Sequence, residues 1–185
     1  TNTKQVFHFG GGHDHIYPFM KALQKNEASS GLGIINIDAH CDTRTDELPH
    51  SGTPFRQFAS YIAESRQNFD FHLVQLGLHS YANPKENYDA LPQGRMSVIQ
   101  GEEFTGLGNE GERQLREIVE AEKEKTWVLS LDCDGLNASF MQAVSAVNHA
   151  GLSLEQLFHL GDLYQELTEG QERQYFGVYE YNPLF

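Results

Sequence analysis

Cysteine, long apolar runs and positive charge are all scarce in this sequence of 185 residues. Its two cysteines are too few for the disulfide framework of a small secreted domain. No apolar run reaches the roughly 18 residues that a membrane-spanning helix needs. Lysine and arginine number 13 against 26 acidic residues, which gives a formal net charge of −13. Because phosphate binding requires a basic surface, we expect neither nucleic acid nor a membrane as a partner.

The remaining composition is that of a globular protein. Apolar residues make up 39% and charged residues 21% of the chain. We expect a single domain over residues 1–185, since a chain of this length buries about 70% of its unfolded surface. No signal peptide precedes Thr1, so a cytoplasmic location is the default expectation. The chain opens almost directly into a strand, which suggests that an N-terminal portion of a longer protein is missing.

Short apolar runs alternate with amphipathic segments along the chain. Strands are expected at 5–9, 33–38, 72–78, 96–99, 126–132 and 175–181, and helices at 17–25, 53–66, 110–123 and 153–167. Strands that are apolar on both faces indicate a parallel sheet covered on both sides by helices. We therefore predict an α/β fold, a three-layer α/β/α arrangement with a mostly parallel sheet. The glycine- and acid-rich segment 101–111 is expected to form an exposed loop.

Side chains that commonly bind metals follow three of the expected strands. In open parallel sheets, ligands bind outside the carboxyl ends of the strands. We therefore expect these side chains to meet, although up to about 120 residues separate them in sequence. The candidate metal ligands are His13, Asp38, His40, Asp42, Asp132 and Asp134.

The two cysteines lie inside the ligand groups but on alternate positions. Side chains two residues apart on an extended chain point to the same side. Asp38, His40 and Asp42 are therefore expected to share one side of their strand and its extension. Cys41 and Cys133 then point the other way, so we expect them to pack near the site without binding metal.

The donor set indicates which metal the site would take. Carboxylates packed together repel one another, and divalent cations remove that repulsion. Oxygen and imidazole ligands without thiolate suit Mn²⁺ better than a structural Zn²⁺ site. Two such ions about 3.5–4 Å apart can share carboxylates and activate a water molecule.

Asp38-x-His40-x-Asp42 after its apolar run favours metal binding even alone, but the other motifs taken singly have simpler interpretations. His13 could be an ordinary loop histidine, and Asp132 with Asp134 could form a strand-end turn. The triple glycine before His13 could cradle a phosphate, but it lacks the Lys-Ser/Thr of a P-loop. His15 is close enough to be confused with His13, which we prefer because it directly follows the glycines. It is the combination of the motifs that favours a metal site.

Four segments together resemble the motifs of the ureohydrolases, the family of arginase, agmatinase and formimidoylglutamase. These segments read Gly-Gly-Gly-His at 10–13, Asp-Ala-His-Cys-Asp at 38–42, Ser-Leu-Asp-Cys-Asp at 130–134 and Glu-Tyr-Asn-Pro at 180–183. The resemblance implies an arginase-like fold and two Mn²⁺ per chain, bound by the six candidate ligands. It also implies that Glu180 pairs with the guanidinium or amidinium group of a small-molecule amidine substrate.

Within that family, three segments look most like formimidoylglutamase. They read His-Ser-Gly-Thr-Pro-Phe-Arg-Gln at 50–57, Leu-Gly-Leu-His-Ser-Tyr-Ala-Asn at 76–83 and Val-Ser-Ala at 144–146. Arginases and agmatinases usually carry His-Gly near the first segment, where this chain has Ser51-Gly52 with His50 one position earlier. The segment 135–143 also departs from the family pattern beside the expected substrate pocket.

The resemblance implies hydrolysis of N-formimidoyl-L-glutamate to L-glutamate and formamide, a step of histidine degradation, by attack of a metal-bridging hydroxide. Asp42 would bind metal and accept a hydrogen bond from that hydroxide, and Glu180 would hold the amidinium. Asp42 or His50 would carry a proton to the leaving amine.

The substrate's carboxylates need cationic or amide donors. Arg44 and Asn83 are the principal candidates, with His79 and Arg56 as further ones. Two alternatives stay open: an agmatinase or other amidinohydrolase, and a metal-binding pseudoenzyme of the same fold. Members of the family commonly form trimers or hexamers, so a homo-oligomer is a further expectation.

Overall fold

The computed structural model describes residues 4–26, 30–65, 69–104 and 109–184, and within them six parallel strands form one sheet. The order across the sheet is β1-β6-β5-β2-β3-β4. The strands are β1 (Lys4–Phe9), β2 (Leu32–Ile37), β3 (Phe71–Leu76), β4 (Met96–Ile99), β5 (Thr126–Asp132) and β6 (Arg173–Tyr179).

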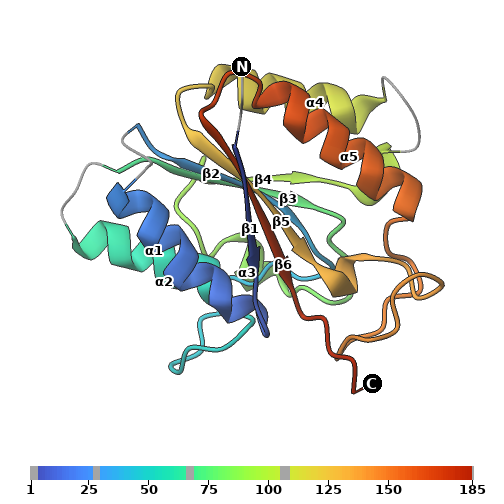
Figure 1. The fold of residues 1–185 in the computed structure, drawn as a ribbon. Helices are drawn as coiled ribbons and strands as arrows, with labels where there is room; N and C mark the ends of the chain where they lie inside the picture. Colours follow the sequence, from blue (N-terminus) through green and yellow to red (C-terminus); the bar gives the residue numbers. More distant parts are fainter. Residues whose placement is uncertain (1–3, 27–29, 66–68, 105–108, 185) are drawn as a thin grey trace.

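Helices cover both faces of this sheet (Figure 1). The four longer helices are α1 (Ile16–Asn26), α2 (Pro54–Glu64), α4 (Glu110–Ala121) and α5 (Leu154–Leu167). The shorter ones are η1 (His13–His15), α3 (Lys85–Tyr88), η2 (Gly101–Phe104) and η3 (Cys133–Gly135). Side chains of α1 and α2 pack on one face, and those of α4 and α5 pack on the other. The prediction of a three-layer α/β/α fold is confirmed.

The central strands are apolar because both of their faces are covered. Every residue of β2 and of β3 is buried. Ile34 packs toward α1 and α2, whereas its neighbour Ile35 packs toward α4 and α5. Burying a large aliphatic side chain stabilises a fold by about 1.5–3 kcal/mol, so these strands carry much of the core's free energy. At Gly33 the Trp127 ring lies so close that a Cβ atom there would collide with it.

The expected elements are present, with differences at their ends. Ser153 caps α5 in a capping box with Gln156. The short helix α3 was not expected from the sequence. The prediction of an exposed loop at 101–111 is wrong in its described part, because η2 buries Phe104 and α4 begins at Glu110. The rest of that segment, 105–108, lies outside the described residues, as does position 66 at the expected end of α2.

The sheet order brings separate ligand segments together. Strands β1, β6, β5 and β2 are consecutive neighbours, and all run in the same direction. Their carboxyl ends therefore lie along one edge of the sheet, where the loops after Phe9, Ile37, Asp132 and Tyr179 meet. Parallel register places residues from distant parts of the chain at this edge.

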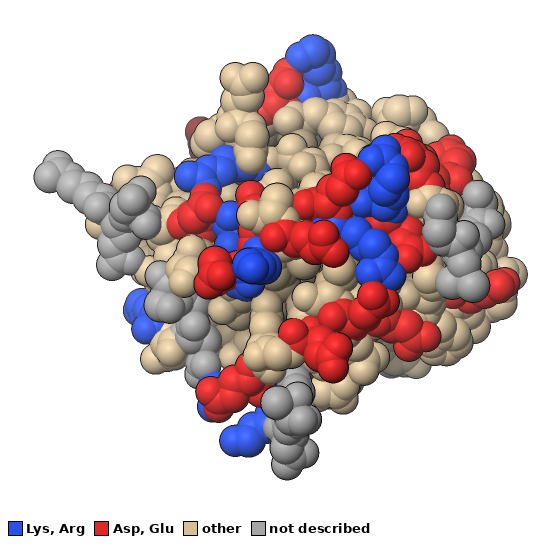
Figure 2. Space-filling model, turned by 90° about the horizontal axis from the view of Figure 1, so that it is seen from above, with Lys and Arg blue, Asp and Glu red and all other residues tan. Residues whose placement is uncertain are grey.

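The surface on the side of α4 and α5 is predominantly acidic. Figure 2 looks at this side from above and shows acidic side chains interspersed with fewer basic ones. On α4, Arg113 pairs with Glu110 and Glu117, and Arg116 pairs with Glu166 on α5. The visible face therefore carries no continuous basic patch. Among the described residues, no helix combines the length and apolar character needed to cross a membrane.

Candidate metal centre

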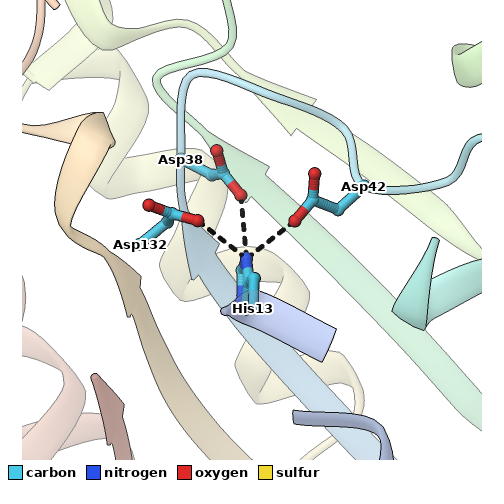
Figure 3. Close-up of side chains that lie close together, drawn as sticks. All are labelled: His13, Asp38, Asp42 and Asp132. Carbon is cyan, nitrogen blue, oxygen red and sulfur yellow. Dashed lines mark ion pairs between the residues drawn. The ribbon is translucent and has the colours of Figure 1, made fainter. Parts of the chain in front are cut away.

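Three carboxylates surround one histidine at the carboxyl edge of the sheet (Figure 3). His13 begins η1 and is completely buried. Its Nδ1 atom lies 3.2 Å from Asp38 Oδ2, 2.8 Å from Asp42 Oδ2 and 3.1 Å from Asp132 Oδ2. These four side chains come from the ends of β1, β2 and β5, as the sheet order requires.

A second group of ligands adjoins the first and shares Asp38 with it. His40 Nδ1 lies 3.1 Å from Asp134 Oδ2 and 3.5 Å from Asp38 Oδ1. The Oδ2 atom of Asp38 faces His13, whereas its Oδ1 atom faces His40. One carboxylate therefore presents one oxygen to each group, which is the arrangement that two neighbouring cations can share.

The loop after β2 reaches this geometry in a way that the sequence pattern did not predict. β2 ends at Ile37, and Asp42 has a left-handed backbone with φ 53°. The backbone N–H of His40 donates to Asp38 Oδ1 at 2.7 Å. The prediction that Asp38, His40 and Asp42 lie on one side of an extended chain is therefore wrong in its geometry, because the chain turns. The turn brings Asp42 to the first group and His40 to the second.

Two candidate ligand atoms, one on His13 and one on Asp134, are buried without a hydrogen bond. In His13, Nε2 lies 3.0 Å from the Ser130 hydroxyl, while the buried Nδ1 makes no aligned hydrogen bond, although three carboxylate oxygens lie within 3.2 Å of it. Asp134 Oδ1 is likewise buried without a partner. Buried polar atoms in proteins nearly always have a hydrogen-bond partner, so these two atoms without one need an explanation. A cation between the carboxylates and the two histidines would satisfy both, and the residues present fit that group.

The electrostatics of the cluster are those of negative charges confined without enough counter-charge. Burial, reinforced by repulsion from Asp38, raises the pKa of Asp42 to about 6. Burial and the same repulsion raise the pKa of Asp132 well above its usual value. Hydrogen bonds to Asp134 and Asp38 raise the pKa of His40 to about 11. Protons thus partly neutralise the site, and a divalent cation would do the same more strongly.

Both cysteines are buried beside the ligands but belong to neither metal-ligand group of the described residues. Burial, together with the neighbouring aspartates, raises the pKa of Cys41 and that of Cys133 to about 12. A thiol with so high a pKa is a poor metal ligand, because the thiolate is the form that binds. The oxygen and imidazole donors remain the ones available to a metal.

Several residues that hold the ligands were not identified from the sequence. The Asn36 side chain donates to Asp38 Oδ2 at 3.2 Å and to Gln75 Oε1 at 3.0 Å. Gln75 in turn donates to the Cys41 carbonyl at 2.6 Å. Both are fully buried polar residues within apolar strands. That pattern is the signal by which they could have been found.

On the other side of the site, Tyr179 positions the His13 ring. The two rings stack with centroids 4.8 Å apart. The Tyr179 hydroxyl lies 3.0 Å from His8 Nδ1, which fixes the tyrosine from the neighbouring strand β1. Contacts of this kind around a metal-binding histidine set its orientation and are commonly as important as the ligands.

A cavity of about 160 Å³ opens beside the ligands. The residues that line it are His40, Asp42, Arg44, His50, Ser51, Gly52, Asp132, Asp134, Ser145, Ala146 and Glu180. Three predicted non-metal residues, Arg44, His50 and Glu180, are thus at the cavity. His50 Nε2 lies 2.8 Å from Asp46 Oδ2, and its Nδ1 accepts from the Gly52 N–H at 3.0 Å.

Glu180 directly follows β6 and is held tightly. Its backbone is left-handed with φ 61°, and its N–H donates to the Gly11 carbonyl at 2.7 Å. Its Oε1 accepts from the His13 N–H at 3.0 Å. A non-glycine residue with positive φ costs free energy and is found mainly where function requires the position. The strain here directs the Glu180 carboxylate toward the cavity and the glycine loop.

Asn83 and Arg56 are not where a substrate-binding role would put them. The Asn83 side chain accepts from the Cys41 N–H at 2.7 Å and donates to the Ala39 and His79 carbonyls. Arg56 donates to the Arg44 and Asp46 carbonyls. Neither lines the cavity, because their polar groups hold the loops that surround it. The expectation that Asn83 contacts substrate directly is therefore not supported by its geometry.

His79 does not line the cavity either. Its Nε2 lies 3.1 Å from Asn148 Oδ1. The Asn148 amide donates to the Asp134 carbonyl at 2.9 Å, so the pair connects two loops at the rim of the site. His79 thus supports the loop that carries Asp134.

Comparison with known proteins gives a consistent result. The profile of the arginase family matches residues 1–185. The formimidoylglutamase of Staphylococcus haemolyticus is 31% identical over 159 residues, which are 85% of this chain and 48% of the relative. That of Photorhabdus laumondii is 30% identical over 177 residues, 95% of this chain and 54% of the relative. The chain spans about half the length of the curated relatives it matches.

Solved structures share the fold. The formimidoylglutamase of Bacillus subtilis superposes with a TM-score of 0.76 at 21% identity, over 95% of this chain and 53% of that one. The Trypanosoma cruzi formiminoglutamase with Mn²⁺ gives a TM-score of 0.72 at 24% identity, over 97% of this chain and 58% of that one.

Proposed function

Since the chain belongs to the arginase family, we propose that it carries the two-metal site of an enzyme that hydrolyses a C–N bond of a linear amidine. The observation that carries the proposal is the pair of ligand groups that share Asp38, four of whose side chains line a small cavity. The orphaned Nδ1 atom of His13 supports a cation in the first group. The resident ions would be Mn²⁺, which the oxygen-rich donor set favours.

The substrate we propose is N-formimidoyl-L-glutamate, with water converting it to L-glutamate and formamide. The curated relatives named above are formimidoylglutamases. Among the residues that line the cavity, Arg44 is placed to attract a carboxylate of the substrate. A guanidinium pairs well with a planar carboxylate and repels the cationic tail of agmatine or the guanidinium of arginine. Arg44 is therefore the residue that would favour the acidic substrate.

Glu180 and Asp42 would orient the reacting groups. The Glu180 carboxylate would accept hydrogen bonds from the amidinium N–H groups and hold the amidine carbon above the metal ligands. Asp42 Oδ2 lies 2.8 Å from His13 Nδ1. This oxygen would orient the attacking water by accepting a hydrogen bond from the water's O–H group. When bound, the two cations would supply an activated water and would stabilise the charge that develops around the amidine carbon during the reaction.

The leaving amine of glutamate must receive a proton as the C–N bond breaks. Asp42 would transfer it directly, because it faces the cavity from inside the ligand group. His50 offers a second route from the cavity wall. The Asp46 carboxylate at 2.8 Å from His50 Nε2 would stabilise the protonated imidazole during such a transfer.

The proposal is tested by incubating Mn²⁺-loaded protein with N-formimidoyl-L-glutamate, and with agmatine and arginine in parallel. Release of glutamate that requires Mn²⁺ and is abolished in Asp132→Ala is the expected result. Turnover of agmatine or arginine instead would retain the site but refute the substrate. Two bound metals with no turnover of any of the three would favour a metal-binding pseudoenzyme.

A further inference from the structure

A second constellation of reactive side chains lies away from the metal centre. A groove of about 540 Å³ runs between α4 and the edge of the sheet formed by β3 and β4. Its lining residues are His72, Ser97, Val98, Ile99, Gln114, Glu117, Ile118, Ala121 and Glu122. Volumes of this size are typical of small-molecule sites, and three of the lining residues are connected by hydrogen bonds.

Those three residues form a chain of serine, histidine and carboxylate. Ser97 Oγ lies 3.0 Å from His72 Nε2. His72 Nδ1 lies 2.9 Å from Glu122 Oε2. A nucleophile within hydrogen-bond reach of a base, with the base oriented by an acid, is the recognisable geometry of nucleophilic catalysis. The atoms are in the order that this chemistry requires.

Sheet geometry brings the three together and separates them from the metals. His72 is the second residue of β3 and Ser97 the second residue of β4, on adjacent strands. Their side chains lie on the face that α4 covers, and Glu122 caps the carboxyl end of α4. The metal ligands follow the carboxyl ends of strands, whereas these residues are near the amino ends of theirs. The two sites are therefore at different edges of the molecule.

The proton positions follow from the charge on Glu122. Burial opposes ionisation there, but hydrogen bonds from Lys125 and His72 prevail and lower the pKa of Glu122. Lys125 Nζ lies 2.9 Å from the same Oε2 atom. An ionised carboxylate can only accept, so His72 Nδ1 must carry the hydrogen. In neutral His72, the Nε2 atom then carries no hydrogen, and its lone pair accepts a hydrogen bond from the Ser97 hydroxyl.

The acid is fixed in place by its surroundings. The Glu122 carbonyl accepts from Trp127 Nε1 at 3.2 Å. Lys125 is itself buried and also pairs with Asp70 Oδ2 at 2.5 Å. Preorganised supporting contacts of this kind are what a catalytic histidine needs in order to keep one tautomer and one orientation.

We propose that Ser97, His72 and Glu122 form a metal-independent acyl-transfer site that hydrolyses short, uncharged acyl esters. Ser97 Oγ forms a bond to the ester carbonyl carbon while its proton moves to His72 Nε2. The C–O bond to the alcohol then breaks, and His72 returns the proton to the departing alkoxide. Water repeats the sequence, releasing the carboxylic acid and restoring Ser97.

The edge strand offers a donor for the developing oxyanion. In the parallel pairing of β3 with β4, the Leu73 N–H donates to the Arg95 carbonyl, so residues 95, 97 and 99 direct their backbone groups toward β3. The N–H of Val98, the residue after Ser97, therefore points away from β3, at the outer edge of the described sheet. A backbone N–H next to the nucleophile is a common oxyanion donor.

The lining of the groove limits the acyl group. Val98, Ile99, Ile118 and Ala121 supply apolar surface. The charged side chains that line the described groove, those of Glu117 and Glu122, are both acidic. A negatively charged acyl group would be repelled, and a short neutral one fits the apolar wall. Ser97 is partly exposed, so such a substrate can reach it.

The test uses a fluorophosphonate probe and p-nitrophenyl acetate on the full chain in excess EDTA, which removes hydrolysis by bound metal. We expect the probe to form a covalent bond with Ser97 in the protein without substitutions. Peptide mass spectrometry of the labelled protein would locate that bond. Ester hydrolysis should fall about 100-fold or more in Ser97→Ala and in His72→Gln, since a positioned base contributes about 10²–10⁴-fold. Ser60→Ala, which changes an exposed serine on α2, should keep the full rate.

Absence of probe at Ser97, or equal hydrolysis by the unmodified protein and Ser97→Ala, would overturn the proposal and leave the three residues as a structural network. Because mass spectrometry locates the probe without any variant, the test remains decisive even if Ser97→Ala misfolds. The result is independent of amidine hydrolysis, which needs metal and uses the other edge of the sheet.

Discussion

Asp38 belongs to both ligand groups of the proposed metal centre. Its side chain is fully buried, and its two oxygens face different histidines, His13 and His40. Hydrogen bonds to those histidines overcome the effect of burial and lower the pKa of Asp38 to about 2. Asp38 is therefore ionised near neutral pH in the metal-free fold. The other ligands serve one group each in the described geometry.

This arrangement predicts different losses of metal from two single substitutions. His40→Ala removes a ligand of the second group only, so we expect about one Mn²⁺ per chain to remain tightly bound. Asp38→Ala removes an oxygen from both groups, so both affinities should fall. Isothermal titration with Mn²⁺ measures the two stoichiometries. Equal losses in the two variants would contradict the sharing of Asp38.

The protonation of the ligands predicts how metal stabilisation depends on pH. In the metal-free fold the pKa of Asp42 is about 6 and that of His40 about 11, and both values are raised. The folded chain then binds more protons than the unfolded chain, at Asp42 between about pH 4 and 6 and at His40 between about pH 6.5 and 11. Metal-free stability therefore falls as pH rises through both windows.

Mn²⁺ competes with those protons, so its stabilising effect should change in the opposite direction. We expect the increase in Tm on adding Mn²⁺ to grow from pH 5 to pH 8. Differential scanning fluorimetry with and without the metal at each pH measures it. An increase in Tm that is constant or shrinks over this range would show that the clustered side chains are not the metal ligands.

At the scale of elements, the loop from Asp38 to Asp42 depends on a segment that follows β3. Asn83 is buried and satisfies both the Cys41 N–H and the Ala39 carbonyl. Without it, the Cys41 N–H would lose its partner, and the Ala39 carbonyl would keep only its bond from the His79 N–H. The Asn83 amide thus helps to hold the loop and its ligands in shape, together with the Gln75 and Asn36 side chains.

Asn83→Ala should consequently destabilise the fold by about 1–3 kcal/mol and weaken Mn²⁺ binding by about 10–100-fold. Asn26→Ala is the matched control, because the Asn26 amide is exposed and donates only to the Ala22 carbonyl of its own helix. Urea unfolding and metal titration report the two effects. Unchanged metal affinity in Asn83→Ala would refute its positioning role.

The contact between β2 and β5 gives a second prediction about packing. A Cβ at Gly33 would collide with the Trp127 ring, which is fully buried and cannot move aside easily. Gly33→Ala should therefore cost about 1–3 kcal/mol of stability. Gly161 on α5 has nothing within 4 Å of such a Cβ, so Gly161→Ala should stabilise by about 0.5–1 kcal/mol. Chemical denaturation of both variants checks the sign of each change.

The sequence predicted the elements that local patterns specify and missed those that tertiary contacts specify. The continuous apolar run around Ile35 indicated a doubly covered strand, and the ligand groups indicated a site at the strand ends. The left-handed turn at Asp42 could not be read from residue spacing. Nor could the use of Asn83 and Arg56 by backbone groups, since it depends on loops that meet only in the folded chain.

At the scale of the whole molecule, one parallel sheet separates the two proposed sites. At the carboxyl edge, four of the six candidate metal ligands line one cavity together with Glu180 and Arg44. The groove between α4 and β4 holds Ser97, His72 and Glu122 on the α4 face. The parallel register produces both, because it brings distant segments to common edges.

The most direct test of the central claim is a crystal structure of the Mn²⁺-loaded protein with anomalous scattering measured at the manganese absorption edge. We expect two anomalous peaks, about 3.5–4 Å apart, one on each side of the Asp38 carboxylate. The first should lie against His13 Nδ1 and the second against His40 Nδ1. A single peak, or a peak bound by Cys41 or Cys133, would contradict the two-metal site proposed for this chain.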